Sequence, residues 1–268
     1  MSSFRGRFRG AILLAHEYGK LALNCRIVSI VCLVDLVCII QVTFLNPIAV
    51  RLPPHSKKHY CTSVIALVDY GSGNLRSVQK ALLRVGAEVQ IVTRPEQLKE
   101  ARAAVLPGVG AFDDCIHALN KQGLLEASKE FIRSGKSFLG ICVGYQALFD
   151  KSEEFNSCAA GLGIFSGSVV RFTENDGIKI PQIGWNQIEI TKPECPLFRG
   201  IDSGSYVYFV HSFFPRPADA SLAAARTTYG ETFASSIWRD NVFATQFHPE
   251  KSQNIGLRLL RNFVEFAG

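Results

Sequence analysis

The chain has 268 residues, 47% of them hydrophobic, and a formal net charge of +6, so it is long enough for one large globular domain with an appendage. Residues 1–62 hold eight Lys and Arg and two acidic residues, whereas residues 63–268 hold 21 of each sign. Because the neutralisation of phosphates needs clustered Lys and Arg, the neutral second part argues against nucleic-acid binding.

The eight cysteines divide equally between these two parts of the chain. Their spacing contains neither a CxxC pair nor the Cys/His pattern of a zinc site. We therefore expect reduced thiols, a cytoplasmic protein, and neither a metal ion nor a cofactor.

Residues 1–62 contain an apolar run from Ile27 to Leu45, which is long enough to cross a bilayer. Asp35 lies within that run, and an acidic residue there costs about 3 kcal/mol on insertion. The start of the chain is basic and has no acidic residue before Glu17, which is compatible with targeting to an organelle. A dispensable extension with a misassigned start is the third interpretation, and all three stay open.

After a predicted linker at residues 52–63, the domain assigned to residues 63–268 begins with short apolar strands that alternate with amphipathic helices. Residues 74–86 predict a helix that ends at a glycine. The pattern indicates an α/β fold with a mostly parallel sheet flanked by helices, in which chemistry collects at the carboxyl ends of strands. The strands are predicted at residues 63–70, 88–93, 103–108 and 137–143.

Beyond Asp150 the predicted strands become shorter and are separated by turns. We expect an antiparallel portion packed on the same sheet rather than a second domain. A closing helix at residues 254–267 supplies apolar side chains to the core. The strands of this portion are predicted at residues 167–172, 186–190, 206–213, 221–227, 233–240 and 242–249.

The stretch GICVG, residues 140–144, places Cys142 between two glycines after a strand. This pattern is typical of a nucleophile elbow, a turn so tight that Gly140 and Gly144 are needed to relieve crowding. Such a turn exposes the sulfur and aims the N-terminus of the following helix at it, which favours the thiolate. The alternative is an ordinary cysteine packed among small apolar residues. The rest of the chain must show which of the two Cys142 is.

A nucleophilic thiol needs a base and a third group that orients the base. The domain offers His117, His211 and His248. His248 follows a strand, and Glu250 lies two positions on, so in an extended stretch both side chains fall on the same side. His117 lies in a helical stretch and is predicted to be a surface residue. His248 is therefore the predicted base.

The transition state also needs donors for an oxyanion. Gly108 and Gly110 follow another predicted strand, where backbone without side chains can present N–H groups. The predicted donors are the amides of Val143 and of Val109 or Gly110. Because glycines flank Val109, the peptide at this residue can adopt two orientations. This predicts a switch, in which the N–H faces the oxyanion in only one of them. A plain glycine turn is the alternative.

Three motifs together resemble the class I (triad) glutamine amidotransferases: LPGVGAF, GICVGYQALF and FATQFHPEKS. Within that family the domain is most similar to the glutaminase subunits of imidazole glycerol phosphate synthases, through VDYGSGNLRSV, IPQIGWNQI and YFVHSF. The resemblance implies the class I glutamine amidotransferase fold and a role in histidine biosynthesis. It extends over residues 63–268 only.

The resemblance also implies a role for each residue of the motifs. Cys142 would be the nucleophile, His248 its base and Glu250 the orienting carboxylate. Gln146 and Gly110 would hold the substrate glutamine, which is hydrolysed to glutamate and ammonia.

In this family the ammonia passes to a cyclase with a (βα)8 barrel, which forms imidazole glycerol phosphate and aminoimidazole carboxamide ribonucleotide. Because no barrel precedes Gly268, we expect the cyclase to be a separate protein in a heterodimer. The resemblance places four residues on the contact face, namely Asn74, Trp185, Asn186 and Lys251.

Two positions depart from the family pattern. Tyr145 stands where Met is usual, and Gln182 stands where His is frequent. Neither removes a member of the triad, so they affect the pocket and the interface rather than the reaction. The alternatives are an amidotransferase subunit serving another synthase and an idle regulatory subunit held to a membrane by residues 27–45.

Overall fold

The structure is a computed structural model that describes residues 63–71, 74–174 and 177–268. The predictions made for residues 1–62, including the apolar run from Ile27 to Leu45, therefore lie outside the described residues. Of the helices in the described part, none is long and apolar enough to cross a membrane.

The centre of the fold is an eight-stranded sheet in the order β2-β1-β3-β4-β13-β12-β11-β8. Its first five strands are parallel, and β3 and β4 are buried along their whole length. Strands covered on both faces need continuous apolar runs, which is what these two have. The sequence predicts the parallel arrangement for β1 to β4. The assignment of residues 242–249 to the antiparallel portion is wrong in part, because β13 pairs in parallel with β4. The five strands are β1 (Val64–Val68), β2 (Glu88–Val92), β3 (Ala103–Gly108), β4 (Ser137–Cys142) and β13 (Val242–Thr245).

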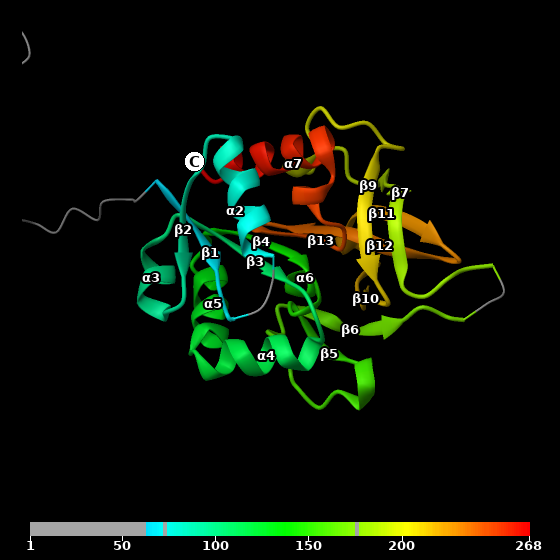
Figure 1. The fold of residues 1–268 in the computed structure, drawn as a ribbon, viewed down its shortest axis with the longest axis horizontal. Coiled ribbons are helices and arrows are strands. Elements are labelled where there is room, and N and C mark those ends of the chain that lie inside the picture. The colour runs from blue at the N-terminus through cyan, green and yellow to red at the C-terminus, as the bar shows by residue number, and fades with distance from the viewer. Residues whose placement is uncertain (1–62, 72–73, 175–176) are drawn as a thin grey trace, which may run out of the picture. The chain divides into compact units, whose positions relative to one another are not determined.

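Helices cover both faces of the parallel strands. Figure 1 shows α2 and α7 above the sheet and α4 and α5 below it. The predicted apolar face of α2 is confirmed, because Val78, Ala81 and Leu82 are buried. The helices are α2 (Leu75–Arg84), α3 (Pro95–Glu100), α4 (Phe112–Lys121), α5 (Leu124–Arg133) and α7 (Gln253–Phe266).

The remaining strands divide among three sheets rather than joining only one, and all their pairings are antiparallel except that of β5 with β6. β12 (Glu231–Arg239), β11 (Ala223–Tyr229) and β8 (Glu189–Ile190) extend the large sheet, as predicted. The others form a sheet of β10, β6 and β5 and a ribbon of β7 and β9. These are β5 (Phe149–Ser152), β6 (Phe165–Arg171), β7 (Gln182–Gln187), β9 (Tyr206–His211) and β10 (Phe213–Pro217).

The strand predicted at residues 206–213 is wrong in one respect, because it is two strands in two different sheets. β9 ends at His211 and β10 begins at Phe213. Between them, the Ser212 carbonyl accepts a hydrogen bond from the backbone N–H of Phe172. The chain can therefore leave the ribbon for the three-stranded sheet without an unpaired carbonyl at the corner.

Aromatic packing joins the three sheets into one core. The Phe172 ring lies 4.8 Å from that of Phe214 in β10 and 5.4 Å from that of Phe233 in β12. Phe233 in turn lies 6.0 Å from Phe209 in the ribbon. Edge-to-face aromatic pairs at these distances add to the stability gained by burial. The ribbon is thus tied to the large sheet whose strand ends carry the candidate site.

Candidate active site

Cys142 occupies a strained turn at the carboxyl end of β4. Its backbone has φ 55° and ψ −111°, a conformation that is rare for a residue with a side chain. A Cβ on Gly144 would collide with the Leu106 carbonyl oxygen, and one on Gly140 would lie 2.6 Å from the Gly144 carbonyl oxygen. The crowding expected at both glycines is therefore present, and the turn has the geometry of a nucleophile elbow.

Two details of the elbow differ from the expectation. The helix that follows, α6 (Val143–Gln146), has only four residues, and the chain enters β5 at Phe149. One turn of helix aligns few peptide dipoles, so its N-terminus contributes little to a thiolate. The Cys142 side chain is also buried, with 5% of its surface exposed, rather than held out of the fold. Its charge must therefore be stabilised by neighbouring side chains.

His248 reaches the elbow because β13 pairs in parallel with β4. Nδ1 of His248 lies 2.8 Å from Oε1 of Glu250, and both side chains are almost fully buried. The backbone N–H of His248 donates to the Tyr208 carbonyl, which fixes the base against the ribbon. Within the described residues, Nε2 of His248 makes no hydrogen bond. The sequence-based pairing of His248 with Glu250 thus has a direct geometric counterpart.

The environment of His248 favours the imidazolium. Burial alone lowers its pKa, but the interactions of the ring with Cys142 and Glu250 outweigh burial and raise the pKa to about 10. The Cys142 thiol and the His248 ring are therefore neighbours that interact directly. A protonated base beside the nucleophile favours the thiolate form of a cysteine.

Two buried amides complete this side of the site. Nε2 of Gln146 donates to the Phe213 carbonyl at 3.0 Å and to Oε1 of Gln246 at 3.3 Å. Nε2 of Gln246 in turn lies 3.7 Å from the Cys142 sulfur. Sequence reasoning singled out Gln146 but missed Gln246. The only local signal is a polar residue within the apolar run FATQF.

The loop from Gly108 to Phe112 runs beside the elbow. Gly108 pairs directly with Cys142, and a Cβ on it would lie 2.7 Å from the Gly144 nitrogen. Gly110 has φ 91°, which side chains rarely allow, and Val109 is 38% exposed. The assignment of Val109, Gly110 and Val143 as oxyanion donors stays a prediction.

The far end of this loop is held by a residue that sequence reasoning also missed. Oε2 of Glu154 accepts a hydrogen bond from the Phe112 backbone N–H at 2.7 Å. Phe112 is the first residue of α4, so the carboxylate lies at the N-terminus of a helix, where negative charge is favourable. The loop is therefore anchored at both ends.

The other two histidines are not placed to act as the base. His117 is exposed on α4, as expected. His211 is buried, and burial lowers its pKa to about 4. Its ring nitrogens face the Phe213 carbonyl and the Gln182 amide. His211 is thus a neutral structural residue.

Three of the four predicted partner-contact residues are exposed: Asn74, Trp185 and Lys251. Tyr208 links two of them, with its ring 6.0 Å from that of Trp185 and 5.7 Å from Nζ of Lys251. Asn186 is half-buried, and its Nδ2 donates to the Thr228 carbonyl. The side chain of Asn186 therefore helps to hold the ribbon against β11.

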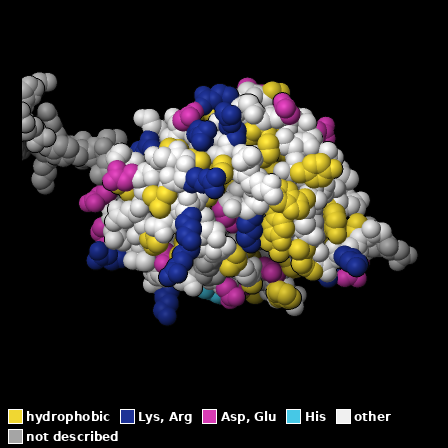
Figure 2. Space-filling model, turned by 45° about the horizontal axis from the view of Figure 1, so that its top comes forward, with side chains coloured by type: hydrophobic (Ala, Val, Ile, Leu, Met, Phe, Trp, Pro, Cys, Tyr) yellow, Lys and Arg dark blue, Asp and Glu magenta, His cyan; other side chains and the backbone are white. Residues whose placement is uncertain are grey.

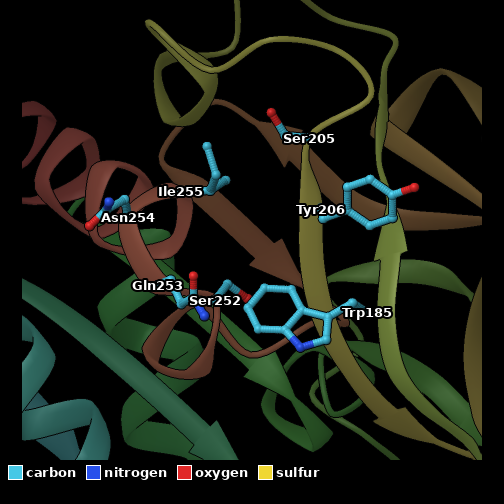
Figure 3. A pocket seen from close by; sticks show the side chains of 7 residues that line it. All are labelled: Trp185, Ser205, Tyr206, Ser252, Gln253, Asn254 and Ile255. Atoms are coloured by element: carbon cyan, nitrogen blue, oxygen red, sulfur yellow. The ribbon is translucent and has the colours of Figure 1, made fainter.

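A pocket opens beside Trp185. Figure 3 shows the Trp185 side chain reaching from the ribbon toward Ser252 at the beginning of α7, and Ser205, Tyr206 and residues 253–255 complete the lining. Ile183, Trp185 and Tyr206 are all among the large hydrophobic side chains that remain exposed. In Figure 2 hydrophobic side chains gather beside a row of Lys and Arg side chains. This surface is described below as the ribbon face, defined by Ile183, Trp185, Tyr206 and Lys251.

Within the described part of the chain, no group of three or more His, Cys, Asp or Glu side chains could hold a metal ion. The four cysteines of that part are free: Cys115, Cys142, Cys158 and Cys195.

Comparison with known proteins gives a consistent result. The family model for glutamine amidotransferase class-I matches residues 66–266. The imidazole glycerol phosphate synthase subunit HisH of Syntrophotalea carbinolica is 51% identical over 205 residues, 75% of this chain and 98% of the relative. The protein with the same name from Geobacter sulfurreducens is 48% identical over 206 residues, again 75% of this chain and 98% of the relative.

Solved structures with lower sequence identity share the fold. A crystal structure of a glutamine amidotransferase covers 77% of this chain and 100% of its own, with a TM-score of 0.60 and 23% identity. PurLQS from Thermotoga maritima has a TM-score of 0.61 and 18% identity, covering 76% of this chain and 99% of its own. At these identities the likeness concerns the arrangement of helices and strands.

Proposed function

The chain belongs to the class-I glutamine amidotransferase family, and from that premise we propose that it hydrolyses glutamine to glutamate and ammonia and passes the ammonia to a separate cyclase subunit. The observation that carries the proposal is the buried pair of His248 and Glu250 beside Cys142 on a strained turn. This is the arrangement that covalent catalysis by a thiol requires.

In the first half-reaction the Cys142 sulfur attacks the side-chain amide carbon of glutamine. A carbon–sulfur bond forms, and the electron pair of the carbonyl moves onto its oxygen. The amides of Val109 or Gly110 and of Val143 are the proposed donors to this oxyanion. The carbon–nitrogen bond then breaks, and the nitrogen leaves as ammonia with the proton that His248 held on Nε2. A γ-glutamyl thioester remains on Cys142.

The second half-reaction returns the enzyme to its starting state. His248, now neutral, takes a proton from water on Nε2, and the water oxygen adds to the thioester carbon. The carbon–sulfur bond breaks to release glutamate and the thiolate. Glu250 keeps the other proton of the ring on Nδ1 throughout, which leaves Nε2 in the tautomer that both steps need. Gln146 and Gly110 are proposed to hold the substrate.

The proposed partner is a cyclase with a (βα)8 barrel, bound as a heterodimer. The HisH relatives are named as subunits of imidazole glycerol phosphate synthase, which supports a shared assembly. The ribbon face offers exposed aromatic surface with a cation beside it, as protein interfaces commonly do. We therefore assign Asn74, Trp185, Asn186 and Lys251 to the contact with the cyclase. The cyclase would combine ammonia with a ribulosyl-carboxamide nucleotide to give imidazole glycerol phosphate and aminoimidazole carboxamide ribonucleotide.

A glutamate-release assay on the purified protein tests this proposal. We expect glutamine turnover that increases when the cyclase and its nucleotide ligand are added. Turnover that no cyclase increases would point to a different synthase, and no turnover in any mixture would point to an idle regulatory subunit.

The variant Cys142→Ala gives the sharper test, because it removes only the nucleophile. We expect it to abolish glutamine hydrolysis while the complex still makes product from added ammonia. Retention of near wild-type glutamine turnover by Cys142→Ala would contradict the covalent mechanism.

A further inference from the structure

The side chain of Gln246 connects the nucleophile Cys142 with the side chain of Gln146. It is fully buried at the end of β13, two residues before His248. Its Nε2 lies 3.7 Å from the Cys142 sulfur, and its Oε1 accepts from Gln146 at 3.3 Å. The N–H and C=O groups of a buried amide both need hydrogen-bond partners, and those of Gln246 find them in Cys142 and Gln146.

The orientation of the Gln246 amide follows from its neighbours. Both N–H groups of Gln146 are used, one on the Phe213 carbonyl and one on Gln246. Gln246 must therefore present its oxygen to Gln146, which leaves its NH2 group toward the sulfur. An N–H donor stabilises a thiolate more than a thiol, because it interacts with the negative charge.

The outer end of this network is equally fixed. The Phe213 carbonyl also lies 2.9 Å from Nδ1 of His211, so it accepts two hydrogen bonds. Because the ring is neutral and a carbonyl can only accept, the single proton of the ring is on Nδ1. Nε2 of the ring lies 3.0 Å from Oε1 of Gln182. Gln182 pairs directly with His211 across the ribbon. The Phe213 carbonyl, and with it Gln146, is thereby held in place.

We propose that Gln246 is a further catalytic residue of the glutaminase reaction, which donates a hydrogen bond to the Cys142 thiolate and at the same time holds the Gln146 side chain in the pocket. The inference rests on the proposed function, since it assigns a role within that reaction. It explains how a thiolate is accommodated in a buried position whose following helix has only one turn.

Two other titratable groups act on the Cys142 sulfur. His248 and Cys115 on α4 both interact with it electrostatically. Burial raises the pKa of Cys115 to about 12, so this thiol stays neutral. Neither group changes when Gln246 is replaced, so a shift in Cys142 reactivity can be assigned to the amide.

The test is the pH dependence of Cys142 alkylation by iodoacetamide in the full chain, followed by mass spectrometry of the Cys142 peptide. Gln246→Met has a similar shape but no donor, and Gln246→Asn keeps an amide that is one carbon too short. For both variants we expect the profile to move to higher pH. At pH values below the wild-type midpoint, alkylation should be slower by about tenfold or more, as expected for the loss of one hydrogen bond to a charged group.

A matched control separates this role from simple loss of stability. Asn262 on α7 is an equally buried amide whose Nδ2 donates to the Leu197 and Arg199 carbonyls. Asn262→Leu should lower the melting temperature and leave the alkylation profile unchanged. If either folded Gln246 variant gave the wild-type profile, the inference would be wrong. Alkylation does not need glutamine turnover, so this result is independent of the proposed function.

Discussion

The elbow around Cys142 and the loop from Gly108 to Phe112 lie side by side, yet they are built in opposite ways. At the elbow, Gly140 and Gly144 pack so tightly that a single added carbon would strike backbone. At the tip of the loop, a Cβ on Gly110 would meet nothing within 4 Å, although its φ of 91° disfavours any side chain.

This difference indicates that the elbow and the loop have different roles. The nucleophile, its base and the orienting carboxylate are fixed by packing and buried hydrogen bonds before any substrate arrives. The proposed oxyanion donors Val109 and Gly110 belong to a segment that is anchored at Gly108 and Phe112 but has room between them. Such a segment can adopt two peptide orientations, and a bound partner can select one of them.

The largest effect on stability and on glutamine turnover is expected from a substitution at Gly144. In Gly144→Ala the new Cβ collides with the Leu106 carbonyl, so β3 or the elbow must shift. We expect a loss of about 3 kcal/mol or more in the free energy of unfolding, as for other overpacked core sites. Glutamine turnover should fall below detection, since the shift displaces the sulfur. Urea unfolding and the glutamate-release assay measure the two effects.

Gly86→Ala is the control for Gly144→Ala. Gly86, unlike Gly144, needs a glycine conformation, with φ 91°, but a Cβ there would meet nothing within 4 Å. Its replacement should cost only about 1–2 kcal/mol from backbone strain and leave turnover unchanged. Equal losses of stability in the two variants would show that close packing does not distinguish the elbow.

The next effect concerns the charge of Glu250. Gln in its place keeps an acceptor for Nδ1 of His248 but removes the negative charge. We expect glutamine turnover to fall by about a hundredfold or more, yet less than in His248→Gln, because orientation is lost rather than the base. A smaller loss in His248→Gln than in Glu250→Gln would contradict the assigned roles.

The stability of Glu250→Gln relative to wild type should also depend on pH. The His248 pKa is raised in the folded protein from 6.5 to about 10. The stability that this shift contributes is fully present below about pH 6.5 and is lost as the pH rises through about 10. The difference in stability between wild type and Glu250→Gln should therefore shrink from neutral pH toward pH 10, as followed by thermal melts. A difference that is constant across this range would contradict the charged pair.

The smallest effect is expected from removing residues 1–61. β1 begins at Val64 and is already paired on both sides, with β2 and with β3. A chain that begins at Thr62 should therefore be soluble, hydrolyse glutamine and bind the cyclase as the full chain does. Insoluble or inactive protein would show that the removed residues belong to the core.

Much of the fold could be predicted because its signals are local. The apolar runs of β3 and β4 and the spacing of Val78, Ala81 and Leu82 each specify an element within a few residues. The break between β9 and β10 has no such signal, since YVYFVHSF reads as one strand. What divides it is the pairing of its two halves with different partners, β7 and β6, neither of which adjoins it in the sequence.

The site follows the same rule. Cys142 between two glycines and His248 two residues before Glu250 are short patterns with a known chemical meaning. Gln246 and Glu154 act through contacts with Cys142 and Phe112, which are far away along the chain. Gln182 also gains its role only through the register that sets it opposite His211. Long-range pairing, rather than residue type, creates these functions.

The most direct test of a fixed nucleophile beside an adjustable oxyanion loop measures two rates on the same samples. Iodoacetamide alkylation of the Cys142 peptide reports the nucleophile, and glutamate release reports the whole reaction, each for the subunit alone and with the cyclase and its nucleotide ligand. We predict that turnover rises by about a hundredfold to a thousandfold, the value of one oxyanion donor, while the alkylation rate changes little. Alkylation that rises in proportion to turnover, or turnover that is equal in both samples, would contradict this account.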